Sequence, residues 1–133
     1  WALDLTHLDA FADRSLDALS GGQRQRVWIA MALAQDTGLI LLDEPTTYLD
    51  LNGQRAFMEM LAQLKAQGKT VILVLHDIGQ ALEISDTLVI MQDRKIAATA
   101  TPQECLRQHI IEEVFDVRLK EFSDEEGHYY FFY

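Results

Sequence analysis

Residues 19–26 read Leu-Ser-Gly-Gly-Gln-Arg-Gln-Arg, and they introduce a helical pattern over Gln23–Ala34. Ser20 is expected to be the N-cap, because its hydroxyl can accept hydrogen bonds from N–H groups that the first helical turn leaves unpaired. Gly21 and Gly22 have no Cβ, so another molecule can approach their backbone closely. The free N–H groups and the positive end of the helix dipole favour a phosphate there. A plain turn and cap has the same pattern, so the interpretation depends on the residues that follow.

The composition indicates a globular domain that does not bind nucleic acid. The 133 residues include 21 carboxylates and 11 basic side chains, for a net charge of −10, whereas a nucleic-acid binder normally shows a basic face. The one cysteine, Cys105, excludes an internal disulfide and fits a reducing compartment. The longest apolar run, Val27–Ala34, is far too short to span a membrane. Because Trp1 is not a translation start, we expect further sequence upstream of it.

Two short apolar runs end in polar residues that carry chemistry. Leu39–Leu42 predicts a strand covered on both faces, and it ends in Asp43 and Glu44. Val71–Leu75 predicts a second buried strand, which ends at His76. In parallel α/β sheets, ligands bind beyond the carboxyl ends of the strands, so these side chains are candidates for a site. The plainer alternative is a strand that leaves the sheet through an acidic turn.

Helical patterns alternate with these strands and indicate an α/β fold. A helix is expected over Leu51–Gln67, with a buried stripe that includes Phe57 and Leu64 and a stop at Gly68. The other expected elements are weak helical structure in Trp1–Ala18, a short helix through Ser85, strands over Leu88–Met91 and Lys95–Ala98, one helix from the capping box Thr101–Glu104 that carries Leu106, Ile110, Val114 and Phe115, and a hairpin of Val117–Phe122 and His128–Tyr133 around Asp124–Gly127. This order predicts a parallel sheet with an antiparallel appendix.

Four motifs in these segments resemble those of the ATP-binding cassette (ABC) family. Leu19–Gln23 resembles the signature motif, Leu39–Glu44 the Walker B strand and Thr47–Asp50 the D-loop. His76 resembles the switch histidine. Within the family, Asp43–Asp50 is similar to the importers of ferric siderophores, haem and cobalamin. The resemblance implies a partial P-loop NTPase fold whose parallel sheet lacks the Walker A strand. It covers the chain as one partial domain: the end of a helical subdomain (1–19), a catalytic core (20–116) and a C-terminal hairpin (117–133).

The resemblance also implies a role for each matching residue. Asp43 would hold Mg²⁺, a hard cation that prefers oxygen ligands. Glu44 would act as general base or orient the attacking water, and His76 would contact the γ-phosphate. Asp50 would lie at a dimer seam. The residues that would bind the ATP of the opposite subunit are Ser20, Gly21, Gly22 and Gln23.

One expected motif of the family is missing from the sequence. No Gly-x-x-x-x-Gly-Lys-Ser/Thr loop is present to cradle the phosphates. Gly68-Lys69-Thr70 imitates its end, but it joins a helix to a strand, so we interpret Lys69 as an exposed lead-in to the strand. We therefore expect that the chain alone neither binds ATP tightly nor hydrolyses it. We also expect a gap between the two buried strands, left by the missing Walker A strand. If the chain folds alone, we expect it either to repack or to pair with another copy through the exposed edges of these strands.

Three functions are compatible with these observations. The first and favoured one is a subunit of a transport ATPase that drives import through separate transmembrane permease subunits. It would be a homodimer, peripheral on the cytoplasmic face of the membrane. The second is an ABC protein of DNA repair or translation, against which the acidic balance argues. The third is a non-enzymatic truncated remnant, for which the missing phosphate loop is the main support.

Overall fold

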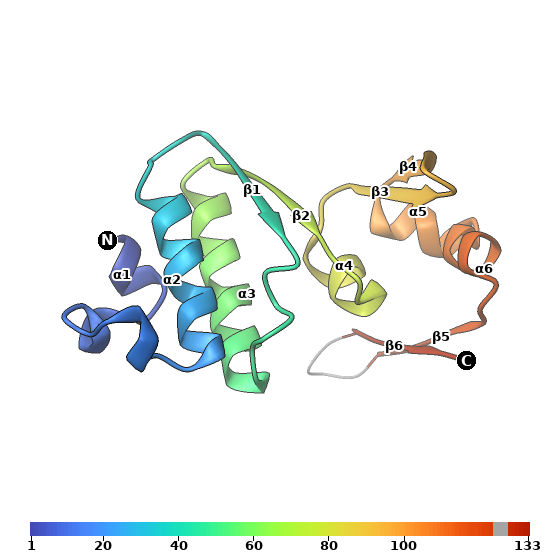
Figure 1. Ribbon diagram of the computed structural model, residues 1–133. Helices are drawn as coiled ribbons and strands as arrows, with labels where there is room; N and C mark the ends of the chain where they lie inside the picture. Colours follow the sequence, from blue (N-terminus) through green and yellow to red (C-terminus); the bar gives the residue numbers. More distant parts are fainter. Residues whose placement is uncertain (124–127) are drawn as a thin grey trace. The chain divides into compact units, whose positions relative to one another are not determined.

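The computed structural model describes residues 1–123 and 128–133, so the expected hairpin turn Asp124–Gly127 lies outside the described residues. The chain forms two compact units, Trp1–His76 and Asp77–Tyr133 (Figure 1). Among the described residues, no helix is both long enough and apolar enough to cross a membrane.

The first unit packs two long helices against a pair of strands (Figure 1). Its elements are α1 (Ala2–Leu5), the 3₁₀ turns η1 (Asp9–Phe11) and η2 (Leu16–Ala18), α2 (Gly21–Leu33), β1 (Leu39–Asp43), α3 (Leu51–Ala66) and β2 (Thr70–Val74). The predicted stripe of α3 is confirmed, because Phe57, Met60 and Leu64 are buried in one core with Ile29 and Leu33 of α2. Gly68 follows α3 with φ of 74°, a conformation that favours glycine and ends the helix as expected.

Strands β1 and β2 are direct neighbours in a parallel pair. The register runs from Leu39 opposite Thr70 to Asp43 opposite Val74. The expected gap between them is therefore wrong. The backbone N–H and C=O groups of the two strands bond to each other, which leaves no room for a third strand in between.

This sheet is covered on one face, where the sequence predicted cover on both. Ile40 is buried against the helices, and Leu42 and Leu73 pack there too. The opposite face exposes apolar side chains, with Leu41 at 65% and Ile72 at 53%. We call the residues of this face the outer face; they are Leu39, Leu41, Ile72 and Val74.

Helix α2 is also less buried than its apolar sequence predicted. Ile29, Ala30 and Leu33 are buried, but Trp28 is 56% exposed and Met31 is exposed as well. The expectation of a largely buried helix is wrong, because only one side of α2 meets the core of the first unit.

In its described residues, the second unit combines four short strands with three helices. Its elements are α4 (Ile78–Ile84), β3 (Leu88–Gln92), β4 (Lys95–Ala100), α5 (Pro102–Arg107), α6 (Ile110–Phe115), β5 (Leu119–Ser123) and β6 (His128–Phe132). The pairs β3–β4 and β5–β6 are antiparallel, which confirms the expected appendix and hairpin strands. The capping box of Thr101 and Glu104 is also confirmed. The helix that it opens is divided, however, because His109 adopts a left-handed conformation between α5 and α6.

Candidate functional site

Glu44 and His76 meet where the parallel strands end. The N–H of Glu44 donates to the carbonyl oxygen of Val74 at 3.0 Å, which extends the ladder by one residue beyond β1. Oε1 of Glu44 lies 2.7 Å from Nε2 of His76. Because parallel strands bring their carboxyl ends to one edge, two residues 32 positions apart in the sequence become hydrogen-bond partners.

Both oxygens of the Glu44 carboxylate have a partner. Oε1 contacts His76, and Oε2 accepts a hydrogen bond from Oγ1 of Thr47 at 3.2 Å. The hydrogen bond with His76, followed by the charge of that ring, lowers the pKa of the Glu44 carboxyl below its usual range. An ionised carboxylate can only accept, so Nε2 of His76 carries the proton that they share. The side chains of Glu44 and His76 are 44% and 76% exposed, so a ligand can reach both.

The turn of the signature motif, Leu19–Gln23, forms the predicted cap at the start of α2; we call it the signature turn. Oγ of Ser20 accepts from the N–H of Gln23 at 3.3 Å, and Oε1 of Gln23 accepts from the N–H of Ser20 at 2.9 Å. This capping box was not predicted in full, since Gln23 was expected only as a phosphate ligand. The N–H groups of Gly21 and Gly22 belong to the first turn of α2, where the helix itself offers no acceptor.

Close packing joins the signature turn to the D-loop of the same chain. A Cβ on Gly22 would lie 3.0 Å from the carbonyl oxygen of Tyr48, whereas a Cβ on Gly21 would meet nothing within 4 Å. Asp50 follows in this loop as the N-cap of α3, and its Oδ1 accepts from the N–H of Gly53 at 2.8 Å. In the structure, Asp50 therefore caps α3. Its position at a dimer seam stays a prediction.

Asp43 offers one carboxylate to a metal ion at the same strand end. It is the last residue of β1 and is exposed. Within the described residues, no group of three or more His, Cys, Asp or Glu side chains could hold a metal ion. Mg²⁺ is usually bound by one or two carboxylates together with water and substrate phosphates, so a single ligand such as Asp43 fits that ion when nucleotide completes the shell.

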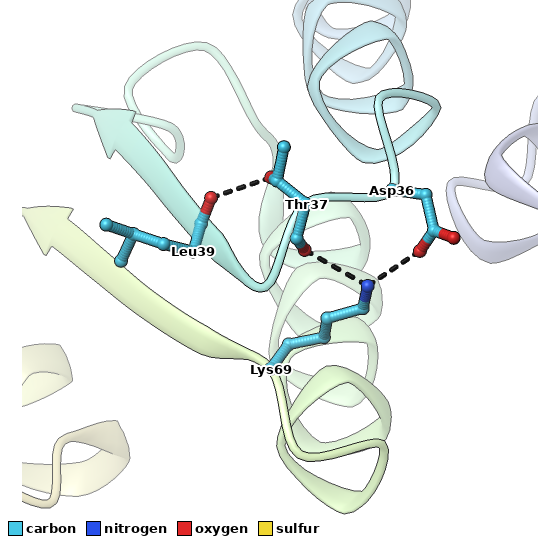
Figure 2. Close-up of polar contacts among 4 residues, drawn as sticks. All are labelled: Asp36, Thr37, Leu39 and Lys69. Atoms are coloured by element: carbon cyan, nitrogen blue, oxygen red, sulfur yellow. Dashed lines mark hydrogen bonds and ion pairs between the residues drawn. The ribbon is translucent and has the colours of Figure 1, made fainter.

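The ammonium group of Lys69 donates hydrogen bonds to two oxygens of its own chain. Figure 2 shows Nζ of Lys69 between Oδ1 of Asp36, at 2.6 Å, and the carbonyl oxygen of Thr37, at 3.0 Å. Its side chain is only 17% exposed, so the expectation of an exposed lead-in is wrong. The hydrogen bond and charge of Lys69 lower the pKa of Asp36. This arrangement supports the view that Gly68-Lys69-Thr70 is not a phosphate loop.

Two contacts of the site escaped the sequence analysis. Thr47 was expected only as part of the D-loop, although its place three residues after Glu44 is a spacing at which a side chain can reach back across a turn. The contact of Gly22 with Tyr48 has no signal in the sequence, because it joins segments whose spacing depends on how α2 packs against α3.

The comparisons with known proteins agree with this geometry. Residues 1–47 match the family model described as ABC transporter. The chain belongs to this family, and its fold is a partial fold of the ABC ATPase class. It is 46% identical over 118 residues to the iron(3+)-hydroxamate import ATP-binding protein FhuC of Bacillus subtilis, an alignment that covers 88% of this chain and 44% of the relative. The chain spans about half the length of the curated relatives that it matches.

Solved structures show the same fold. An inward-facing metal-chelate type ABC transporter matches 99% of this chain and 53% of its own, with a TM-score of 0.84 and 30% identity. The ATP-binding cassette MJ0796, solved as a dimer in a post-hydrolysis state with ADP and Pi, matches 76% of this chain and 44% of its own. That match has a TM-score of 0.69 and 33% identity.

Proposed function

We propose that the chain is part of the ATP-hydrolysing subunit of an importer of ferric siderophores or related iron complexes. The observation that carries this proposal is the hydrogen bond between Glu44 and His76 at the ends of two adjacent parallel strands. A relative whose name specifies import of iron(3+)-hydroxamate supports the choice of cargo.

Glu44 is the base or the orienting group for the attacking water. Its carboxylate is ionised at neutral pH, and the hydrogen bond from His76 lowers its pKa further, so Glu44 can accept a hydrogen bond from the attacking water. His76 fixes Oε1 and, being more exposed than Glu44, can donate to a phosphate oxygen when it turns away from the carboxylate. Phosphoryl transfer depends mainly on positioning and electrostatics, which suits a site made of two mutually held side chains.

Asp43 would contribute a ligand to Mg²⁺. The ion, when bound with nucleotide, neutralises charge on the phosphates. The N–H groups at the start of α2 would bind the terminal phosphate of ATP held by a second subunit. The residues that form this anion site are Ser20, Gly21, Gly22 and Gln23, and Asp50 would face the same seam.

A homodimer on permease subunits at the cytoplasmic face of the membrane completes the proposal. The dimeric MJ0796 cassette supports assembly in pairs, and the transporter matched by this chain supports association with a membrane component. In such an assembly, the first unit would supply the signature turn to one nucleotide and Glu44 to the other. The chain alone, which has no phosphate loop, is then expected to be inactive.

The test is ATP hydrolysis by the full-length protein and three variants. E44Q removes the base and is expected to reduce the rate by about 10²–10⁴-fold. H76A removes its partner and is expected to reduce the rate as well. H109A is the matched control, because His109 also contacts a carboxylate, that of Glu112 at 2.9 Å, but not at a strand end. Unchanged hydrolysis in E44Q would overturn the proposal.

Cargo is tested separately, by uptake of a ferric hydroxamate siderophore into proteoliposomes that contain the permease and the full-length protein. Uptake is expected to require ATP and to be lost with E44Q. ATP-dependent uptake of another substrate, with none of the ferric siderophore, would replace the proposed cargo while leaving the ATPase intact.

A further inference from the structure

The hydroxyl of Thr47 is the contact at the candidate site that the proposed function leaves unexplained. It donates to Oε2 of Glu44 at 3.2 Å, on the oxygen that His76 does not touch. The contact of this hydroxyl is with the Glu44 carboxylate, so Thr47 acts on the site through Glu44.

The backbone places this hydroxyl where it can reach the carboxylate. The N–H of Thr47 donates to the carbonyl oxygen of Glu44 at 3.3 Å, which closes a tight turn. Pro45, inside the turn, is fully buried and limits its movement. Glu44 itself has φ of 46°, a left-handed conformation that is unfavourable for a residue with a Cβ. A strained residue needs support from its surroundings, and the turn supplies it.

We infer that Thr47 is a positioning residue that fixes the carboxylate of Glu44 for reaction with water, an inference that rests on the proposed ATPase function. The last torsion of a glutamate side chain is broad, so a single contact at Oε1 leaves the carboxylate free to rotate. Contacts at both oxygens stop this rotation and fix the orientation of the carboxylate plane. Each oxygen has two lone pairs, so one on each remains available to a water molecule.

Removal of the hydroxyl therefore has an effect that can be distinguished from a loss of stability. The carboxylate loses its fixed plane, which lowers the rate of the chemical step without changing the contacts that bind ATP. The loss also depends on Glu44, because the hydroxyl reaches the site through that carboxylate. In a protein that already carries E44Q, T47V should therefore cause no further loss of rate, whereas a residue that only stabilises the fold would weaken both backgrounds alike.

The experiment compares T47V, T47S and the unchanged full-length protein. T47V keeps the shape of the side chain but has no donor, and T47S restores the hydroxyl. For T47V we expect kcat to fall about tenfold, less than the loss for E44Q, with KM for ATP within about twofold. We expect T47S to recover most of the rate. Thermal unfolding of each variant checks that it is folded.

The direct readout is a double-mutant cycle of T47V and E44Q, measured as the rate of hydrolysis. T47V is expected to lower the rate about tenfold in the unchanged protein and to cause no further loss in E44Q. An equal loss in both backgrounds, an unchanged rate in folded T47V, or a lost rate that T47S fails to recover would overturn the inference. Hydrolysis that survives in E44Q would instead refute the proposed function, so the two failures are distinguishable.

Discussion

Alanine substitution of Gly22, with Gly21 as the matched control, tests how tightly the signature turn packs against the D-loop. A Cβ added to Gly22 would lie 3.0 Å from the carbonyl oxygen of Tyr48, closer than nine in ten real Cβ contacts, while one added to Gly21 meets open space. The loop that holds Tyr48 cannot move freely. Leu49 is buried and Asp50 caps α3, so the backbone on the far side of the contact is anchored.

The expected effects of alanine differ in sign. Neither glycine has positive φ, so alanine fits the backbone at both positions and stabilises by about 0.4–1 kcal/mol through the unfolded state. At Gly22 the overpacking against Tyr48 costs about 1–3 kcal/mol, which outweighs that gain. G22A is therefore expected to be less stable than G21A by about 1–3 kcal/mol. In a unit of this size, 1 kcal/mol corresponds to a shift of about 4–8 °C in Tm.

The assay is thermal unfolding followed by circular dichroism, with both variants measured beside the unchanged protein. G21A is expected to unfold at the same temperature or slightly above it, and G22A several degrees below G21A. Equal Tm values, or a higher Tm for G22A, would show that the D-loop moves away easily and would refute the claim that the two turns are tightly packed.

Two further predictions concern the first unit. K69M removes both the ion pair with Asp36 and the hydrogen bond to the carbonyl oxygen of Thr37. Because the folded pKa of Asp36 is lowered, the stability that the ion pair adds is present above about pH 4 and is lost as pH falls through the folded pKa, so the Tm difference from the unchanged protein should shrink in acid to what the bond to Thr37 contributes. A difference that stays the same at all pH values would contradict this prediction. L41K places a charge on the exposed outer face, so self-association of the chain, measured by sedimentation velocity, is expected to weaken; a chain that is already monomeric at all concentrations would contradict this prediction.

The sequence predicted the elements well where a local signal defines them. The capping residues Ser20 and Thr101, the stop at Gly68 and the stripe on α3 each depend on neighbours in the sequence, and all are confirmed. The sequence predicted that Glu44 and His76 lie at one edge of the sheet, but not their hydrogen bond, because a gap was expected between the two strands.

The wrong or missing predictions mostly concern tertiary structure, that is, which segment packs beside or against a given residue. An apolar run such as Leu39–Leu42 has the same sequence whether one face or both are covered, so the exposed Leu41 was not predicted. The expected gap in the sheet came from an assumed strand order, which periodicity cannot test; β1 and β2 pair directly. The break between α5 and α6 was not predicted, because His109 adopts a left-handed conformation at a position where no glycine indicates one. Tyr48 contacts Gly22 only through tertiary packing, whereas Thr47 reaches Glu44 across a local turn.

The most direct test of the account is to measure ATP binding and ATP hydrolysis on the same sample of full-length E44Q. If Glu44 acts on the attacking water, binding is expected to stay within about twofold of the unchanged protein while hydrolysis falls by about 10²–10⁴-fold. Hydrolysis that continues at the original rate, or a loss of binding that accounts for the whole defect, would contradict the claim that Glu44 and His76 form the hydrolytic centre.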